Sequence, residues 1–119
     1  MRDFRGMKVW EKSHQLALVV YAISAQFPRT EQYGLTSQIR RSAVSIPSNI
    51  AEACGRGSAR EIGHFLQISM GSASELQYEL LLAQDLGILK SSDWEKLDEN
   101  VTEIKRMLAS LIRKLKTDS

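Results

Sequence analysis

The stretch WEKLDENVTEIKRMLASLIRKL, residues 94–115, decides the fold class of this chain. Its apolar residues recur at alternating spacings of three and four, which is the period of a buried stripe along a helix. The stripe consists of Trp94, Leu97, Val101, Ile104, Leu108, Leu111 and Leu115. The stretch therefore predicts a helix over about residues 91–116 that begins at Ser91 or Ser92.

Three further segments carry the same apolar period, and they predict helices over about residues 8–27, 35–54 and 58–86. The last two connections are short, which forces neighbouring helices to run antiparallel, and the first connection allows the same arrangement. No segment shows the alternation that is typical of a strand. The prediction is an all-α, antiparallel up-down-up-down four-helix bundle that forms a single domain over residues 1–119.

Prolines, glycines and a cap mark the predicted helix ends. Pro28 should end the first helix, because the residue before a proline is pushed out of helical geometry. Pro47 lies inside the second helix, removes one backbone hydrogen bond and should bend it. Gly55 fits the left-handed position that closes a helix, and Gly87 should stop the third helix. The spacing of Ser and Glu in residues 58–61 fits a capping box at the start of the third helix.

The composition indicates an ordinary globular protein and excludes several classes. The chain has 119 residues, of which 43% are apolar and 25% charged, which suits one domain with one core. One cysteine, Cys54, excludes an intramolecular disulfide bond. No segment approaches the run of about 20 apolar residues that a membrane span needs, and no signal peptide is evident. We therefore expect a cytoplasmic protein with no membrane contact.

The residues that could carry chemistry do not form a recognisable catalytic or metal site. His14 and His64 are isolated on their helices, and a metal site needs three or four convergent ligands. Residues 55–60, GRGSAR, lack the ending of a phosphate-binding P-loop and follow no strand. We expect no enzyme activity, no metal and no cofactor.

The charges are unevenly distributed, although the net charge is only +2. Residues 1–60 carry nine Lys and Arg against four Asp and Glu, whereas residues 61–119 carry seven against ten. In an up-down bundle, one end should collect basic residues from all four helices and attract a polyanion. Six of them are the candidate phosphate contacts: Lys8, Lys12, Arg56, Arg60, Arg113 and Lys114. Alternatively, cations in the last helical turn complement the helix dipole, which accounts for Arg113 and Lys114 but not for Arg56 and Arg60.

A second set of polar residues is predicted to hold the second and third helices in register. Pairing about the turn at residues 55–57 places residue i near residue 112 − i. The set is a partly buried polar network of Arg40, Arg41, Asn49, Glu52, Ser72 and Glu75. A catalytic carboxylate pair is the other reading of these residues, and no histidine or nucleophile is evidently placed to join it.

The chain also has more apolar surface than one core needs. The surplus residues are Val9, Trp10, Val19, Tyr21, Phe65, Met70, Tyr78, Leu81 and Leu82. They indicate either a subunit interface or a wide core with scattered exposed residues, and the sequence leaves both open.

The run YGLTSQIRRSAVSIPSNIAEA, residues 33–53, resembles a signature of the small four-helix bundle proteins encoded in intervening sequences of bacterial 23S rRNA genes. The resemblance extends to residues 8–10, 27–28 and 71–76, and covers the chain to about Leu89. Many relatives have Glu-Gly where this chain has Glu-Ala-Cys-Gly at residues 52–55. This family is similar to the accessory protein of diversity-generating retroelements, a basic barrel that binds nucleic acid and partners a reverse transcriptase.

The resemblance implies a homo-oligomer that closes into a ring, a pentamer, with RNA or DNA and a reverse transcriptase or other protein as possible partners. We predict a non-enzymatic protein that binds nucleic-acid backbone as such a ring. The alternative is a protein-interaction scaffold with no nucleic-acid role.

Overall fold

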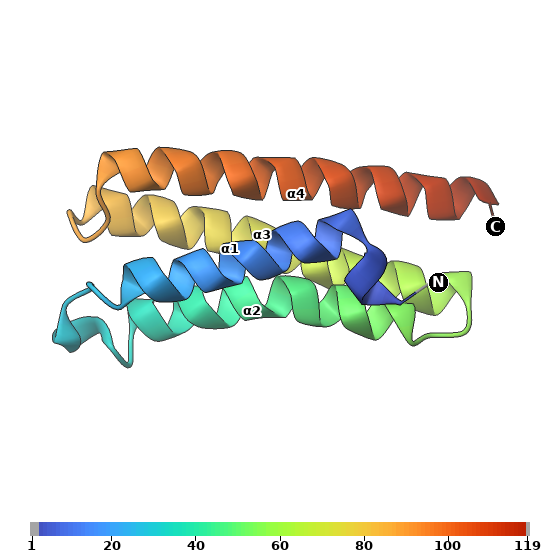
Figure 1. The fold of residues 1–119 in the computed structure, drawn as a ribbon, viewed down its shortest axis with the longest axis horizontal. Helices are drawn as coiled ribbons and strands as arrows, with labels where there is room; N and C mark the ends of the chain where they lie inside the picture. Colours follow the sequence, from blue (N-terminus) through green and yellow to red (C-terminus); the bar gives the residue numbers. More distant parts are fainter. Residues whose placement is uncertain (1–2, 119) are drawn as a thin grey trace.

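The computed structural model describes residues 3–118 and shows an antiparallel four-helix bundle (Figure 1), which confirms the predicted fold class. The helices are α1 (Lys8–Ser24), α2 (Leu35–Cys54), α3 (Ala59–Asp85) and α4 (Ser91–Asp118). Two short 3₁₀ helices, η1 (Phe4–Gly6) and η2 (Arg29–Glu31), precede α1 and α2. The bundle is elongated, with extents of 46 × 22 × 20 Å.

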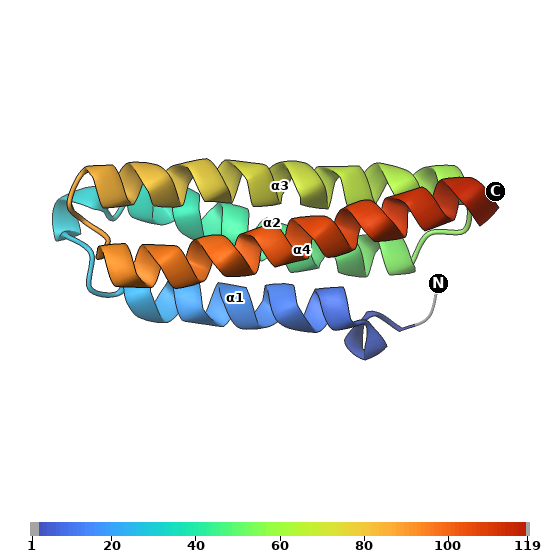
Figure 2. The same cartoon turned by 90° about the horizontal axis from the view of Figure 1, so that it is seen from above.

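Each helix packs against two others. Among the described residues, α1 contacts α2 and α4, and α3 contacts α2 and α4. The pairs α1–α3 and α2–α4 make no contact, so they occupy the diagonals of the bundle (Figure 2). The start of α1, the turn between α2 and α3, and the end of α4 all lie toward the same end (Figure 1). The topology therefore brings together the regions in which the sequence analysis placed the basic residues.

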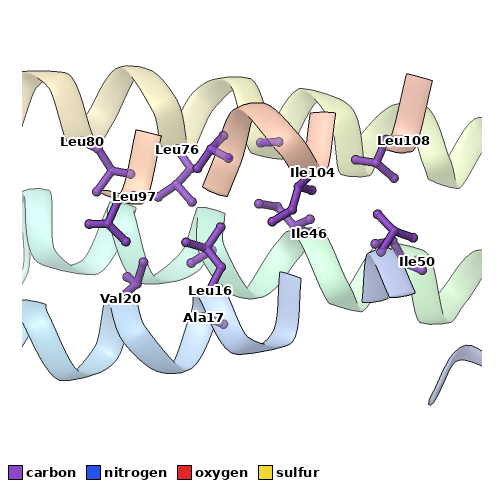
Figure 3. Packing of buried hydrophobic residues seen from close by; sticks show 14 of the residues in the cluster. Leu16, Ala17, Val20, Ile46, Ile50, Leu76, Leu80, Leu97, Ile104 and Leu108 are labelled. Atoms are coloured by element: carbon purple, nitrogen blue, oxygen red, sulfur yellow. The ribbon is translucent and has the colours of Figure 1, made fainter. Parts of the chain in front are cut away.

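The core runs the length of the bundle and takes side chains from all four helices. Leu16, Ile46, Leu76 and Ile104 are almost fully buried and point toward one another (Figure 3). Burial of such a side chain stabilises the fold by about 1.5–3 kcal/mol. None of the four helices within residues 3–118 combines the length and the apolar character that a membrane crossing requires.

Two predicted helix ends follow the capping and proline rules. The Ser58 hydroxyl accepts the Glu61 N–H at 3.1 Å, which is the first of the two bonds of the predicted capping box. The Ser58 hydroxyl also donates to the Glu61 carboxylate at 3.0 Å, whereas in a capping box this carboxylate accepts from the backbone N–H of the cap residue. The first helix ends at Ser24, three residues before the predicted end. Beyond it, Phe27 N–H donates to the Ser24 carbonyl in a tighter turn, which leads the chain into Pro28.

The prediction for Gly55 was wrong. Gly55 has φ −90° and ψ 0°, in the right-handed region. Its N–H donates to the Glu52 carbonyl at 3.1 Å, so the chain leaves α2 through 3₁₀-type bonds that need no left-handed residue. Gly87 has φ +77°, and the Ile88 N–H behind it donates to the Ala83 carbonyl at 2.9 Å. The left-handed closure therefore ends α3, in the pattern of a Schellman motif.

Candidate nucleic-acid interface

The six predicted phosphate contacts fall into three separate groups rather than one cluster. Arg56 and Arg60 flank the α2–α3 turn, and Arg113 and Lys114 lie near the end of α4. Lys8 and Lys12 instead line a groove between α1 and α4 that also contains Ile104. Nine residues separate Ile104 from Arg113, which is about 13 Å along a helix. The basic half of the molecule is therefore broad, and its charges are spread over more than one face.

Arg56 is the most constrained of the six residues. Its guanidinium forms an ion pair with Glu52, one turn earlier, and lies over the Phe65 ring at 4.7 Å from the centroid. The ion pair offsets much of its charge, and the ring fixes its position. Glu52 thus serves the α2–α3 turn and not the network to which the sequence analysis assigned it.

Arg60 lies on the rim of a groove between α3 and α4. Its neighbours in this hollow of about 430 Å³ include His64, Ile112 and Lys116. Gly63 lies against Leu115, where an added Cβ would come within 3.5 Å of the leucine side chain. The groove has an apolar floor and basic residues from two helices at its edge, which suits contact with an anionic chain.

The other cations differ in their acidic neighbours. Lys12 forms an ion pair with Glu103 at 3.2 Å, so its charge is partly compensated. Among the described residues, Lys8, Arg60 and Lys114 take part in no ion pair or side-chain hydrogen bond. Arg113 likewise has no acidic partner, and only its carbonyl accepts a bond, from the Thr117 hydroxyl at 3.0 Å. Four of the six predicted contacts are therefore exposed cations whose charge is compensated by no acidic side chain within 4.0 Å in the described part of the chain.

The predicted polar network is divided among three places. Arg40 faces α1, where its guanidinium donates to the Ser24 hydroxyl at 2.7 Å and lies over the Tyr21 ring at 4.6 Å. Arg41 is exposed and makes no contact of this kind among the described residues. Of the predicted set, only Ser72 and Glu75 form hydrogen bonds between α2 and α3 among the described residues, whereas Asn49 bonds Ser45 within α2.

Hydroxyl and carboxyl groups make that contact between α2 and α3. Ser42 donates to the Glu75 carboxylate at 2.8 Å, and the Ser45 and Ser72 hydroxyls are 2.7 Å apart. The Asn49 amide donates to the Ser45 carbonyl at 2.8 Å. The observed partners in α3 lie five positions beyond those predicted. Side chains lean toward the N-terminus of their helix, which contributes about one position on each helix to this shift.

Glu79 is a buried carboxylate that the sequence analysis missed. Only 6% of its surface is exposed, and its Oε1 has no hydrogen-bond partner among the described residues. Burial raises the pKa of Glu79 above its ordinary value of 4.5, and the neighbouring charge of Glu75 adds to this effect. The nearby Ser42 hydroxyl, whose proton is donated to Glu75, acts on the pKa of Glu79 in the opposite direction. The only sequence signal was its position one turn after Glu75.

The remaining candidate residues pack as ordinary side chains. The His14 ring stacks on Trp10 with centroids 4.9 Å apart, and the His64 ring meets the edge of Phe65. Cys54 is half-buried, and its thiol lies 3.3 Å from the Met7 sulfur. No group of three or more His, Cys, Asp or Glu side chains within the described chain is arranged to hold a metal ion.

The surplus apolar residues divide between the core and the surface. Val9 is buried, and four others pack half-buried against the core: Trp10, Phe65, Met70 and Leu82. Val19, Tyr21, Tyr78 and Leu81 are exposed, together with Leu18, Val44, Ile68 and Leu86. A wide core therefore accounts for five of the nine residues, and for the four exposed ones the subunit interface stays a prediction.

Comparison with known proteins places this arrangement in a family. The model of the 23S rRNA-intervening sequence proteins matches residues 5–110. A crystal structure from Bacteroides thetaiotaomicron, described as a protein of unknown function from the S23 ribosomal protein family, has the same fold. It superposes with a TM-score of 0.80 at 30% sequence identity and covers 87% of this chain and 97% of its own. Among curated proteins, no sequence matches this chain. Because the family model spans most of its length, this chain belongs to the 23S rRNA-intervening sequence proteins.

Proposed function

We propose that this protein is a non-enzymatic nucleic-acid-binding protein that acts as a ring-shaped homo-oligomer. The observation that carries the proposal is the set of four exposed, uncompensated cations on one half of the bundle: Lys8, Arg60, Arg113 and Lys114. Membership of the 23S rRNA-intervening sequence family supports a role beside nucleic acid.

The chemistry of these residues favours contact with phosphates rather than with bases. Exposed Lys and Arg side chains give affinity for the backbone and carry no sequence information by themselves. Their binding to a polyanion releases counterions, so affinity should fall steeply with salt. A ring that aligns the basic halves of several copies would present many such contacts to one nucleic acid, and the affinities of the separate copies would combine.

A titration tests the proposal directly. Labelled structured RNA and duplex DNA would be titrated by fluorescence anisotropy at two salt concentrations, and the native mass would be measured in the same buffer. We expect saturable, salt-sensitive binding by a particle several times the mass of one chain. An absence of binding at low salt, with the oligomer intact, would contradict the nucleic-acid role.

Two pairs of variants locate the contact surface. Arg60→Gln with Arg113→Gln removes two uncompensated cations from the basic half, and each lost phosphate contact should reduce the salt slope by about 1. Lys90→Gln with Lys96→Gln removes the same charge from exposed positions toward the other end and serves as the matched control. Equal losses in both pairs would show that net charge, rather than this surface, governs binding.

Arg56→Gln should weaken binding less than Arg60→Gln, because Glu52 already offsets the Arg56 charge. Arg56 and Arg60 lie close together at the α2–α3 turn, so the two variants differ little in where the charge is removed. A larger effect at Arg56 would mean that the ion pair opens when nucleic acid binds.

The second candidate function is a protein-interaction scaffold, in which the partner could be a reverse transcriptase or another protein. The exposed apolar side chains of α1 and α3 favour this alternative, because such surfaces mark protein contacts. The Arg60 and Arg113 variants separate the two functions, since a scaffold would keep its protein partner when these charges are removed.

A further inference from the structure

Two surfaces of the bundle expose large apolar side chains, one of them a groove and the other the outer side of a helix. The first is a groove of about 380 Å³ between α1 and α2, hereafter the α1/α2 groove. It is lined by Trp10, His14, Ala17, Leu18, Tyr21, Val44, Pro47, Ser48 and Ala51. Leu18 and Tyr21 on its wall are 52% and 46% exposed, whereas small residues of α2 leave its middle open.

The second surface is a stripe along the outer side of α3, hereafter the α3 ridge. It consists of Ile68, Gly71, Glu75 and Tyr78, at spacings of three and four that place the residues on one face of the helix. All four residues are exposed, and Tyr78 is 61% exposed. Gly71 has open space around the position of a Cβ atom, so a neighbouring surface can approach the helix closely here.

The two surfaces face different sides of the molecule. The groove belongs to α1 and α2, whereas α3 lies diagonally opposite α1 and makes no contact with it in the described chain. A contact between the ridge of one copy and the groove of another is therefore head-to-tail. Such a contact generates a ring when the rotation between copies closes.

Charges of opposite sign match when the copies stand side by side at equal height. The hydrogen bond from Ser42 to Glu75 fixes the height of Glu75 on the bundle, next to Arg41 in the sequence of α2. In a ring with its axis parallel to the helices, Glu75 of one copy is level with Arg41 of the next. Arg41 is exposed on α2, three residues before the groove residue Val44, and has no ion-pair partner within its own described chain. This complementarity favours a second copy of the chain over another occupant of the groove.

We propose that the α3 ridge of one copy docks in the α1/α2 groove of the next, with Arg41 opposite Glu75. This interface rests on the ring of the proposed function and identifies the surfaces that form it. The Ile68 and Tyr78 side chains fill the groove beside Leu18 and Tyr21, and the α2 residues Ser48 and Ala51 let the two helices approach.

Directed cross-linking tests the interface in the full chain. In a Cys54→Ala background, cysteines would be placed in the groove by Ser48→Cys and on the ridge by Gly71→Cys. A short bismaleimide reagent should join the doubly substituted chains into a covalent ladder that ends at the size of the ring. Either single substitution alone should give monomers on a denaturing gel, because a head-to-tail contact brings together two different residues.

The control is Ser48→Cys with Ser110→Cys, which places the second thiol at an exposed position on α4. A ladder in this control, or dimers from a single substitution, would overturn the proposed interface. If the native mass is several times one chain but no ladder forms, the interface is wrong and the ring survives. If the native mass is that of one chain, the ring of the proposed function fails as well.

A charge swap provides a second, independent readout. Arg41→Glu and Glu75→Arg should each shift the native mass toward the single chain, and the double variant should restore the oligomer. Circular dichroism would show whether each variant keeps its helices. Helical single variants that retain the native mass would contradict the pairing of Arg41 with Glu75.

Discussion

The two faces through which α3 packs differ in where they keep their polar groups. Toward α2, buried and half-buried hydroxyl groups take part in the contact: the buried Ser42 bonds the exposed Glu75, Ser45 bonds Ser72, and the buried Ser69 donates to the Ile46 carbonyl at 2.9 Å. Toward α4, apolar side chains fill the contact. The polar bonds there lie at its margin, where Gln77 donates to Asp98 at 3.0 Å and accepts from Lys105 at 3.1 Å.

This difference suggests that one face of α3 mainly contributes stability, whereas the other mainly fixes the position of the helices along each other. Apolar contacts are non-directional, so the α3–α4 face supplies stability and tolerates small shifts. If α2 and α3 slipped along each other, their hydrogen-bonding groups would lose their partners, which is costly for buried groups. The α2–α3 face therefore fixes the register of the two helices, although each hydrogen bond adds little net stability. Substitutions on the two faces should therefore differ in size and in kind, and all are compared at one protein concentration because assembly adds to apparent stability.

The largest loss is expected on the apolar face, from Leu108→Ala. Leu108 is fully buried, and its truncation should lower the free energy of unfolding by about 3 kcal/mol, since it removes apolar contact and leaves a cavity. Urea denaturation followed by circular dichroism measures the loss. Met107→Ala, at a half-buried position beside it, is the control and should cost clearly less. Equal losses at the two positions would mean that α4 is not held by its buried stripe.

The turns that join the two pairs of helices should respond differently to the same change. Gly87→Ala forces a side chain into the left-handed region and should cost about 1 kcal/mol. Gly55→Ala should cost little, because Gly55 is right-handed and the new Cβ would lie 3.5 Å from the Glu52 carbonyl oxygen. Thermal denaturation of both variants checks the contrast. A larger loss at Gly55 would reverse the assignment of the two turns.

On the polar face, Glu79→Gln should stabilise the protein at pH 7 by about 1 kcal/mol, since burying a charge costs more than burying an amide. The pKa of Glu79 is raised, so the folded state holds this proton more tightly than the unfolded state does. The native protein should therefore lose stability, relative to Glu79→Gln, as the pH rises from 4.5 through the folded pKa. Urea midpoints of both proteins between pH 4 and pH 8 measure the difference. A constant difference across this range would show that Glu79 keeps an ordinary pKa.

The smallest expected effect is the coupling between Ser45 and Ser72. Each Ser→Ala change should cost about 1 kcal/mol, and the double-mutant cycle should give a coupling of about 0.5 kcal/mol. Gln77→Ala with Asp98→Ala, the corresponding pair at the margin of the α4 face, serves for comparison and should show weaker coupling. A stronger coupling at the margin would mean that the α4 face also specifies register.

Much of the fold could be predicted because helical periodicity and caps are local signals. The stripe of residues 94–115 and the Ser58 cap depend on neighbours within a few positions, and the structure has both. The end of α1 was predicted three residues too late. The apolar period of the sequence continues to Phe27, whereas the backbone changes to i→i−3 hydrogen bonds after Ser24. Gly55 and Gly87 both follow a helix, and their conformations differ because the bonding of the next turn, which no single residue specifies, decides between them.

The candidate site was less predictable, since it depends on which side chains meet across helices. Arg56 and Arg60 have the same residue type and lie on one turn, yet only Arg56 is compensated by an acid. Arg40 turned toward α1 because the Ser24 hydroxyl and the Tyr21 ring lie within its reach. The burial of Glu79 follows from the close approach of α2 at its serines, which a linear pattern does not contain.

The diagonal arrangement of the helices has a consequence for motion. Helix α1 is the shortest of the four, and one of its two neighbours, α4, is separated from it by a groove. Its amide protons should therefore exchange with solvent by local opening before those of α2, α3 and α4. Because α1 also forms one wall of the α1/α2 groove, a copy docked in that groove would hold the helix closed. Assembly would then be detected as slower amide exchange along α1. The helix that opens most readily in one chain would control the release of the neighbouring copy.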